Sequence, residues 1–303
     1  MSVELLDLLT NYEIICCDDD AACRLLQRNW NLSSRPNLQL PSSIANDKSI
    51  EIMLGDKELY SEVIRDNRSS MALVFYLTRR MDQLLKTANI PMLLPAYEIQ
   101  EGLGDKLHLA KICNIVTIPF NHDLIYRNAS ERLNEIFVEC RSTLGLPFIA
   151  QGALGVSGDD TFLVGTEDEL LNTMTALPAG LKAARYIPNN IPLSVHACVL
   201  EDEIVVRGPF LQLLGFPELS ANPFQFAGND TNQSLFNWNI VERIREMSFR
   251  IGGHARSEGY IGILGIDYLW DQNTDAVYPQ ELNTARGAHP APDGHAEGSI
   301  NIS

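Results

Sequence analysis

Three polar side chains in the C-terminal part of the chain have the types and spacing of a metal site. Asp267 lies in one strand-like run, GIDYLW, and Glu281 and Asn283 lie in a second run, AVYPQELN. The polar stretch DQNTD between the runs predicts a hairpin turn, which places Asp267 opposite or nearly opposite Glu281. Two such carboxylates repel each other, and burying them is costly unless a cation is supplied. Hard oxygen ligands of this kind suit Mg²⁺, which shares its shell with waters and substrate phosphates.

A glycine-bearing segment, GALGVSGD at 152–159, is the second candidate piece. Its Gly155, Ser157 and Gly158 offer backbone N–H groups and a hydroxyl that could cover phosphates. The segment is not a Walker P-loop, which needs a lysine followed by Ser or Thr. An ordinary hairpin turn explains this segment equally well. A solvated edge hairpin is likewise the simplest explanation of an isolated E-x-N pattern.

Lys106 is the third candidate, in the stretch LGDKLHLAKICNIVTIPF at 103–120. Asp105 and Lys106 open a helix-like segment that ends before a short strand. The Lys106 ammonium could reach a phosphate, although a surface position is the usual interpretation of such a lysine.

The overall composition limits the partners of the chain. Its 45% hydrophobic and 20% charged residues are typical of a soluble globular protein. A length of 303 residues favours two compact units, or one domain with subdivided lobes. A formal net charge of −16 argues against nucleic acid and anionic membranes as partners. The longest apolar runs, such as MALVFYL at 71–77, are too short to cross a bilayer. The acidic N-terminus is not a secretory signal.

The cysteines indicate a reducing compartment. They show no CxxC spacing, and several lie in apolar helix or strand patterns, which favours free buried thiols over a metal site or disulfides. We therefore expect a cytoplasmic protein. The six cysteines are Cys16, Cys17, Cys23, Cys113, Cys140 and Cys198.

The N-terminal third of the chain has the pattern of a small α/β unit. Strand candidates lie at 12–17, 72–77 and 90–96, and a helix-like segment lies at 78–89. The run at 72–77 is continuously apolar, as expected of a strand that is buried on both faces.

A second unit is predicted from near Glu98 onward. Apolar residues from Leu133 to Cys140 recur at the spacing of an amphipathic helix. Two further strands are joined by a tight acidic turn at Glu201. Another helix is predicted to stop at the Gly-Gly pair that follows Ile251.

In this order and at these separations, the three pieces resemble the ATP-grasp superfamily. The similarity runs over 102–287, more than half of the chain, and GYIGILGIDYL and YPQELN are its most specific parts. The resemblance implies an α/β fold class, with a Rossmann-like pre-grasp domain followed by a two-lobed ATP-grasp fold. The implied domains are an N-terminal α/β pre-ATP-grasp domain at 1–97, a small lobe at 98–186, and a large lobe at 187–303 with the metal-binding hairpin and a short tail.

The resemblance also implies roles for individual residues. Asp267, Glu281 and Asn283 would hold Mg²⁺, or Mn²⁺, on the phosphates of ATP. The segment 185–194 would be the hinge against which adenine lies. The implied nucleotide-binding residues are Lys106, Gln151, Gly155, Ser157, Gly158, Arg185 and Ile187. The candidates for steadying the transferred phosphoryl group are Arg207, Arg250 and Arg286, each equally interpretable as a structural ion-pair partner.

Enzymes of this superfamily typically use ATP to phosphorylate a carboxylate, and an amine or thiol then attacks the acyl phosphate. The resemblance therefore implies an ATP-dependent carboxylate–amine or carboxylate–thiol ligase that releases ADP and phosphate. Its substrates would be a small-molecule carboxylate and an amine, with amino acids or peptides expected by family analogy alone. The sequence names neither substrate. A homodimer is a candidate oligomeric state.

Several positions depart from the superfamily pattern. Gln151 stands where a lysine is usual, Asp160 lies where phosphates are expected, and Pro192 lies near a common glutamate position. Arg286 follows the asparagine by three residues instead of two. These departures favour a second hypothesis, a non-catalytic ATP-binding regulatory or partner protein. A third, an α/β interaction protein with a solvated hairpin, leaves the combined pattern unexplained. The twenty residues after Asn283 fit either a fragment or a minimal form of the large lobe.

Overall fold

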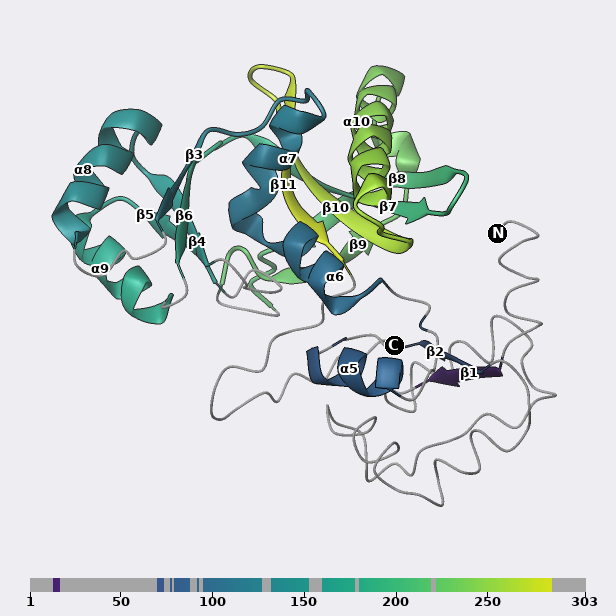
Figure 1. The fold of residues 1–303 in the computed structure, drawn as a ribbon. Coiled ribbons are helices and arrows are strands. Elements are labelled where there is room, and N and C mark those ends of the chain that lie inside the picture. Colours follow the sequence, from purple (N-terminus) through teal and green to yellow (C-terminus); the bar gives the residue numbers. More distant parts are fainter. Residues whose placement is uncertain are drawn as a thin grey trace. The chain divides into compact units, whose positions relative to one another are not determined.

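The chain forms two compact units, which are drawn in Figure 1. One unit contains Met1–Gln100 and Gly259–Gly262, and the other contains Glu101–Glu258 and Ile263–Ser303. The computed structural model describes residues 13–16, 70–73, 77, 79–87, 92, 95–126, 132–152, 160–177, 180–218 and 222–284.

The first unit contains a parallel strand pair and a short helix. Strand β1 (Glu13–Cys16) pairs with β2 (Ser70–Leu73), and α5 (Arg79–Thr87) follows. These elements confirm the predicted strand at 12–17 and the predicted helix at 78–89, whereas β2 begins before the predicted strand at 72–77. Most of the third predicted strand lies outside the described residues. The Rossmann-like character of this unit and the predicted domain boundaries therefore stay predictions.

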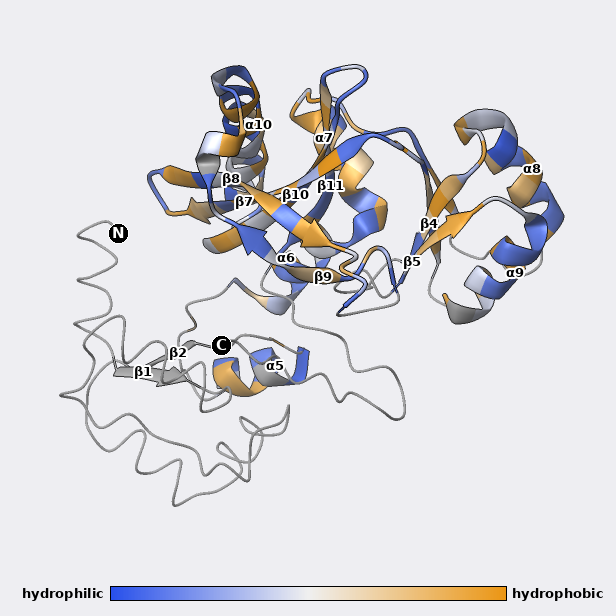
Figure 2. Ribbon diagram, turned by 180° about the vertical axis from the view of Figure 1, so that it is seen from behind, coloured by the Kyte–Doolittle hydropathy of each residue, from blue (hydrophilic) through white to orange (hydrophobic). Residues whose placement is uncertain are grey.

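The small lobe of the second unit is an antiparallel sheet covered by two helices on one face. The strand order is β3-β6-β4-β5. Apolar side chains of α8 and α9 form one buried cluster with alternate residues of β4 and β6. Both helices carry hydrophobic and hydrophilic stretches, as amphipathic helices do (Figure 2). The elements are β3 (Asp123–Tyr126), α8 (Leu133–Leu144), β4 (Phe148–Gly152), β5 (Thr161–Val164), α9 (Glu167–Ala176) and β6 (Leu181–Arg185).

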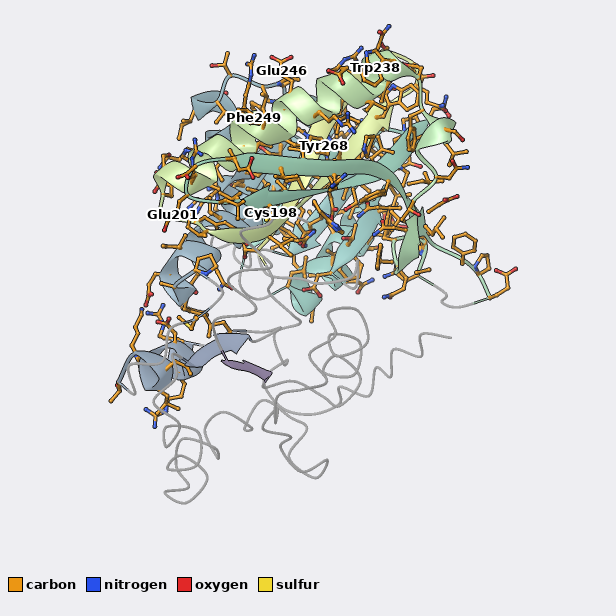
Figure 3. The ribbon with its side chains drawn as sticks, turned by 90° about the vertical axis from the view of Figure 1, so that its right-hand side faces the viewer. Cys198, Glu201, Trp238, Glu246, Phe249 and Tyr268 are labelled. Carbon is orange, nitrogen blue, oxygen red and sulfur yellow. The ribbon has the colours of Figure 1, made fainter. Side chains whose placement is uncertain are left out.

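The large lobe is a five-stranded sheet in the order β11-β10-β7-β8-β9. Helix α10 lies along one face of this sheet, with Trp238, Glu246 and Phe249 on the helix and Tyr268 beneath it (Figure 3). The strands are β7 (Asn190–Val199), β8 (Ile204–Leu214), β9 (Phe226–Asp230), β10 (Gly262–Asp271) and β11 (Ala276–Asn283). The other helices of the second unit are η2 (Lys106–His108), α7 (Leu109–Ile115), η3 (Gln233–Leu235) and α10 (Trp238–Ser257). Helix α6 (Tyr97–Gly104) contains the boundary between the two units.

Most predicted elements of this unit are present. The amphipathic helix from Leu133 and the strand pair joined at Glu201 are confirmed by α8, β7 and β8. Among the described residues, no helix is long and apolar enough to cross a membrane. Cys113 and Cys140 are buried free thiols, and Cys198 is a half-buried one. The side chains of the other cysteines lie outside the described residues.

The predicted helix end at the Gly-Gly pair is wrong, because α10 continues through both glycines to Ser257. Gly252 faces the sheet, where an added Cβ would lie 3.1 Å from Cγ2 of Ile204 and 3.7 Å from Cγ2 of Val199. Gly253 faces open space. The first glycine therefore allows close packing of helix on sheet, a role that the sequence signal of a C-cap does not distinguish.

These two neighbouring glycines provide a matched test of the helix–sheet packing. We expect Gly253→Ala to stabilise the protein by about 1 kcal/mol, because alanine has the higher helix propensity. Gly252→Ala gains the same propensity but crowds Ile204, so it should be about 1 kcal/mol or more less stable than Gly253→Ala. Urea unfolding followed by circular dichroism measures both. Equal stability of the two variants would contradict this packing.

Candidate functional site

The hairpin β10–β11 contains one extra residue that interrupts its register. Asp267 pairs directly with Glu281, as the predicted turn position required. The next residue, Tyr268, pairs with Pro279, so Gln280 is left out of the ladder as a β-bulge. Proline has no N–H to donate, and prolines within sheets are found at bulges and on edge strands. Here β11 is also the edge strand of the sheet.

The bulge decides which face of the sheet the polar residues occupy. Val277 is buried, and an unbroken two-residue alternation from it would turn Glu281 and Asn283 toward the same buried side. After the extra residue, Leu282 is the buried one, at 4% exposure. Glu281 and Asn283 consequently point to the face of Asp267, opposite the face that α10 covers.

Asp267 lies in a half-buried polar network. Its Oδ2 accepts a hydrogen bond from Nδ2 of Asn283 at 2.8 Å. Burial, and after it the negative charge of Glu281, raise the pKa of Asp267 to about 6. Hydrogen bonds from Ser194, Asn283 and Gln212 act in the opposite direction. The ionised Asp267–Glu281 pair therefore carries electrostatic strain that a cation would relieve.

Lys106 supplies one positive charge to this pair. It begins η2, where the carboxylate of Asp105 caps the turn by accepting from the backbone N–H of Leu107 at 2.9 Å. The cap places a lysine that is only 5% exposed beside the edge strand, with its Nζ 3.2 Å from Oε2 of Glu281. The usual interpretation of Lys106 as a surface lysine is therefore wrong.

The donor set has the chemistry that Mg²⁺ prefers, namely oxygens from two carboxylates and an amide. Gly265 pairs with Asn283, and a Cβ at Gly265 would lie 3.0 Å from Cβ of Asn283. The glycine thus leaves room for this third side chain. Among the described residues, no group of three or more His, Cys, Asp or Glu could hold a metal. A metal at the hairpin would therefore depend on the Asn283 amide, waters and ligand oxygens to complete its shell, and metal binding stays a prediction.

A second polar group lies on the small-lobe sheet. Gln151 pairs with Lys182 on one side and with Thr161 on the other, so the three form a row across β6, β4 and β5. Directly paired residues share a face, and their strand neighbours Ala150 and Ala183 belong to the core under α8 and α9. The row therefore lies on the face away from these helices. Lys182 Nζ donates to the backbone carbonyl of Gln280, the bulge residue, at 3.3 Å.

Lys182 was not among the residues predicted from the sequence. It is 3% exposed, and burial lowers its pKa below the usual value of a lysine. The charge of Asp123 raises this pKa, Lys106 lowers it, and Glu281 raises it. Two lysines thus converge on the Glu281 end of the hairpin. The available sequence signal was a single lysine within the otherwise apolar start of a strand, LKAA.

Two predicted arginines lie on opposite sides of the large-lobe sheet. Arg207 is exposed and pairs with His196, which is two residues from Ser194 along β7 and so shares the Asp267 face. Arg250 lies on α10, where its Nη2 is 2.5 Å from Glu246 and its Nη1 donates to the Thr117 carbonyl at 3.3 Å. Arg207 therefore shares the face of the hairpin carboxylates, and Arg250 does not.

The remaining predicted residues divide into two groups. Arg185 ends β6 with an exposed side chain, and its carbonyl accepts from Asn121 at 2.8 Å. Ile187 is buried in the connection to β7, and its carbonyl accepts from Asn190 at 2.6 Å. Both lie where the chain crosses between the two sheets. The residues outside the described part of the chain are Gly155, Ser157, Gly158 and Arg286.

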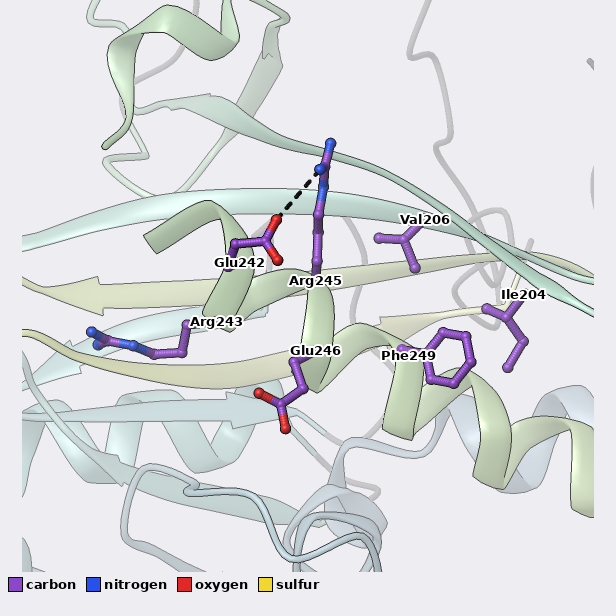
Figure 4. A pocket seen from close by; sticks show the side chains of 7 residues that line it. All are labelled: Ile204, Val206, Glu242, Arg243, Arg245, Glu246 and Phe249. Carbon is purple, nitrogen blue, oxygen red and sulfur yellow. Dashed lines mark ion pairs between the residues drawn. The ribbon is translucent and has the colours of Figure 1, made fainter. Parts of the chain in front are cut away.

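A groove of 610 Å³ lies elsewhere, between α10 and β8 (Figure 4). Ile204 and Val206 of β8 line one side, and Phe249 together with charged side chains of α10 lines the other. Ile204 contacts the Gly252 region of α10, so the groove belongs to the helix-covered side of the sheet. It is therefore separate from the Asp267–Glu281 face.

Comparison with solved structures shows that the chain has the ATP-grasp fold. Biotin carboxylase from Campylobacter jejuni, in complex with an ATP species, matches with a TM-score of 0.71 at 16% identity over 91% of this chain and 66% of that chain. The biotin carboxylase domain of 2-oxoglutarate carboxylase from Hydrogenobacter thermophilus, with MgADP, matches with a TM-score of 0.67 at 13% identity over 91% and 64%. D-alanyl-alanine synthetase A from Vibrio cholerae matches with a TM-score of 0.59 at 16% identity over 73% and 67%.

The chain spans about two thirds of the length of these proteins. No protein-family model and no curated protein matches its sequence. At such low identities the likeness concerns the fold, and the chemistry depends on the side chains described above.

The unfavourable ionisation of Asp267 should lower the free energy of unfolding by an amount that depends on pH. The folded-state pKa lies near 6, above the value of an unfolded aspartate, so folding favours the protonated form. The contribution of Asp267 to stability is then fully present below the pKa of an unfolded aspartate and is lost as pH rises through about 6. Without divalent cations, we expect Asp267→Asn to stabilise the protein by roughly 1–3 kcal/mol at pH 8, and by much less near pH 4. Thermal unfolding across this pH range measures the difference.

Asp271, in the same hairpin, is the matched control. A hydrogen bond from the Thr274 hydroxyl lowers the pKa of Asp271, so its ionised form stabilises the fold. Asp271→Asn should therefore destabilise the protein at pH 8. If both substitutions changed the stability in the same direction at pH 8, the repulsion between Asp267 and Glu281 would be contradicted. A stabilisation by Asp267→Asn that grew at low pH would contradict it as well.

Proposed function

We propose that the protein is an ATP-dependent ligase that activates a carboxylate as an acyl phosphate for attack by an amine or thiol. The observation that carries this proposal is the bulged hairpin, which turns Glu281 and Asn283 onto the face of Asp267. A merely solvated edge hairpin does not need a bulge to bring like charges together. The fold supports the proposal, since its structural neighbours include complexes with ATP species and MgADP.

The small-lobe sheet offers a surface for the nucleotide. Its row of Ala184, Ile149 and Leu163 lies on the same face as the Lys182–Gln151–Thr161 row and two residues away along the strands. Leu163 is 43% exposed on this face, which α8 and α9 leave uncovered. An apolar row beside a polar row suits a base stacked on the first and phosphates on the second.

The described side chains suggest a division of labour. Asp267, Glu281 and Asn283 would hold Mg²⁺, which would neutralise phosphate charge when bound. Lys106 holds Glu281 in place from the edge of the sheet and lies where it could also donate to a phosphate oxygen. Arg207, on the same face of the sheet, would stabilise negative charge that develops on the transferred phosphoryl group. Such catalysis requires mainly positioning and electrostatic stabilisation, which these side chains can supply.

The substrates are expected to be a small carboxylate and an amine, with amino acids or peptides tested first. The direct test is ADP release from MgATP in the presence of paired acids and amines. One pair should stimulate release, and Glu281→Gln should lower that rate by about 100-fold or more, since the carboxylate is a proposed metal ligand. Glu242→Gln, on the exposed surface of α10, is the matched control and should leave the rate unchanged.

A non-catalytic ATP-binding protein is the second candidate, favoured by one observation. Nε2 of Gln151 donates a hydrogen bond to Oγ1 of Thr161 at 3.2 Å, and the glutamine side chain brings no charge to the small-lobe sheet. Tight MgATP binding without ADP release across the whole panel would support this candidate and contradict the ligase. Cytoplasmic localisation and a homodimer stay predictions.

A further inference from the structure

The row across the small-lobe sheet places a lysine directly beside Gln151. Lys182 and Gln151 are register partners on neighbouring antiparallel strands, and both side chains leave the sheet on the same face. Cβ atoms of such pairs are about 5 Å apart, and a lysine side chain is long enough to cover that distance. The Lys182 ammonium, which comes from β6, can therefore interact with a ligand that lies beside Gln151 on β4.

Lys182 is held with its ammonium beside the bulge of the hairpin, where the side chain is 3% exposed. Its neighbours Leu181 and Ala183 are anchored in the core under α8 and α9, which fixes the strand. The contact with the Gln280 carbonyl uses one of the three N–H donors of the ammonium and directs it toward the hairpin. The amino group thus lies between the polar row of the small lobe and the Asp267–Glu281 face of the large lobe.

We propose that Lys182 binds the phosphates of the nucleotide and supplies the positive charge that Gln151 lacks. The assignment rests on the proposed ATP site and adds a residue to it. A neutral glutamine can orient a phosphate oxygen by a hydrogen bond, whereas the charge-assisted bond that holds a polyphosphate comes from the neighbouring lysine. Gln151 in place of the usual lysine then does not disable the site, because Lys182 on the neighbouring strand supplies the positive charge.

A structural role for Lys182 makes different predictions. If the lysine only ties the two sheets together through the Gln280 carbonyl, replacing it would lower stability without any preference for phosphorylated ligands. A lysine placed at position 151 would not correct that loss, because it starts from a different strand. Selectivity for phosphate and rescue from position 151 therefore separate the two roles.

The test compares ATP and adenosine binding, by calorimetry with Mg²⁺, in four folded proteins. Lys182→Met should weaken ATP binding by about 10- to 100-fold, the typical range for a lost hydrogen bond to a charged group, and should leave adenosine binding unchanged. The double variant Lys182→Met/Gln151→Lys should recover most of the ATP affinity. Lys111→Met, an exposed lysine on α7, is the matched control and should bind like the wild type.

A measurement on the wild-type protein covers the case in which Lys182→Met does not fold. An ATP analogue with an acyl group on its γ-phosphate transfers that group to a nearby lysine amine, which forms an amide and releases ATP. Peptide mass spectrometry should find the acyl group on Lys182, and excess ATP should prevent it. Labelling confined to other lysines, or no labelling by an analogue that binds, would overturn the proposal.

The two proposals fail in different ways. If the folded wild-type protein binds no ATP, the nucleotide site itself is absent and both proposals fall. If the wild type binds ATP and Lys182→Met binds it equally well, the ATP site stands and only the role of Lys182 is overturned. Equal losses for ATP and adenosine in Lys182→Met would also overturn it, in favour of the structural role.

Discussion

Electrostatic repulsion between Asp267 and Glu281 is the constraint on which the proposed site depends. The two carboxylates are direct partners on an antiparallel ladder, and burial together with this repulsion raises the pKa of Asp267 to about 6. Two hydrophobic residues at these positions would have made a more stable sheet. A chain that keeps an unfavourable pair gains stability when a cation binds, so the same feature that weakens the empty fold provides a driving force for metal binding.

Positive charge reaches this face from two separate parts of the second unit. Lys106 approaches the edge strand from a capped 3₁₀ turn, and Lys182 approaches from the small-lobe sheet. The bulge at Gln280 connects both, because it turns Glu281 toward Lys106 and offers its own carbonyl to Lys182. In a chain with a formal net charge of −16, these two buried lysines form a local positive region suited to an anionic ligand.

Much of this arrangement could be predicted from the sequence, where local patterns decide the outcome. The turn at DQNTD set the register of Asp267 and Glu281, and the amphipathic spacing from Leu133 located α8. Effects of packing between distant segments could not be predicted in this way. The sequence around Gly252 predicts a helix end, and only the close approach of Ile204 explains the glycine within the helix. The position of Lys182 beside the hairpin depends on the pairing of β6 with β4 and on the contact with β11.

Calorimetric titration of ATP with and without Mg²⁺ tests the central claim most directly. The wild-type chain is compared with an Asp267→Ala/Glu281→Ala variant whose folding is confirmed by thermal unfolding. We expect Mg²⁺-dependent binding by the wild type and its loss in the variant, which would place the metal on this hairpin. No binding by the folded wild type, or equal binding by both proteins, would contradict a metal–nucleotide site at the hairpin.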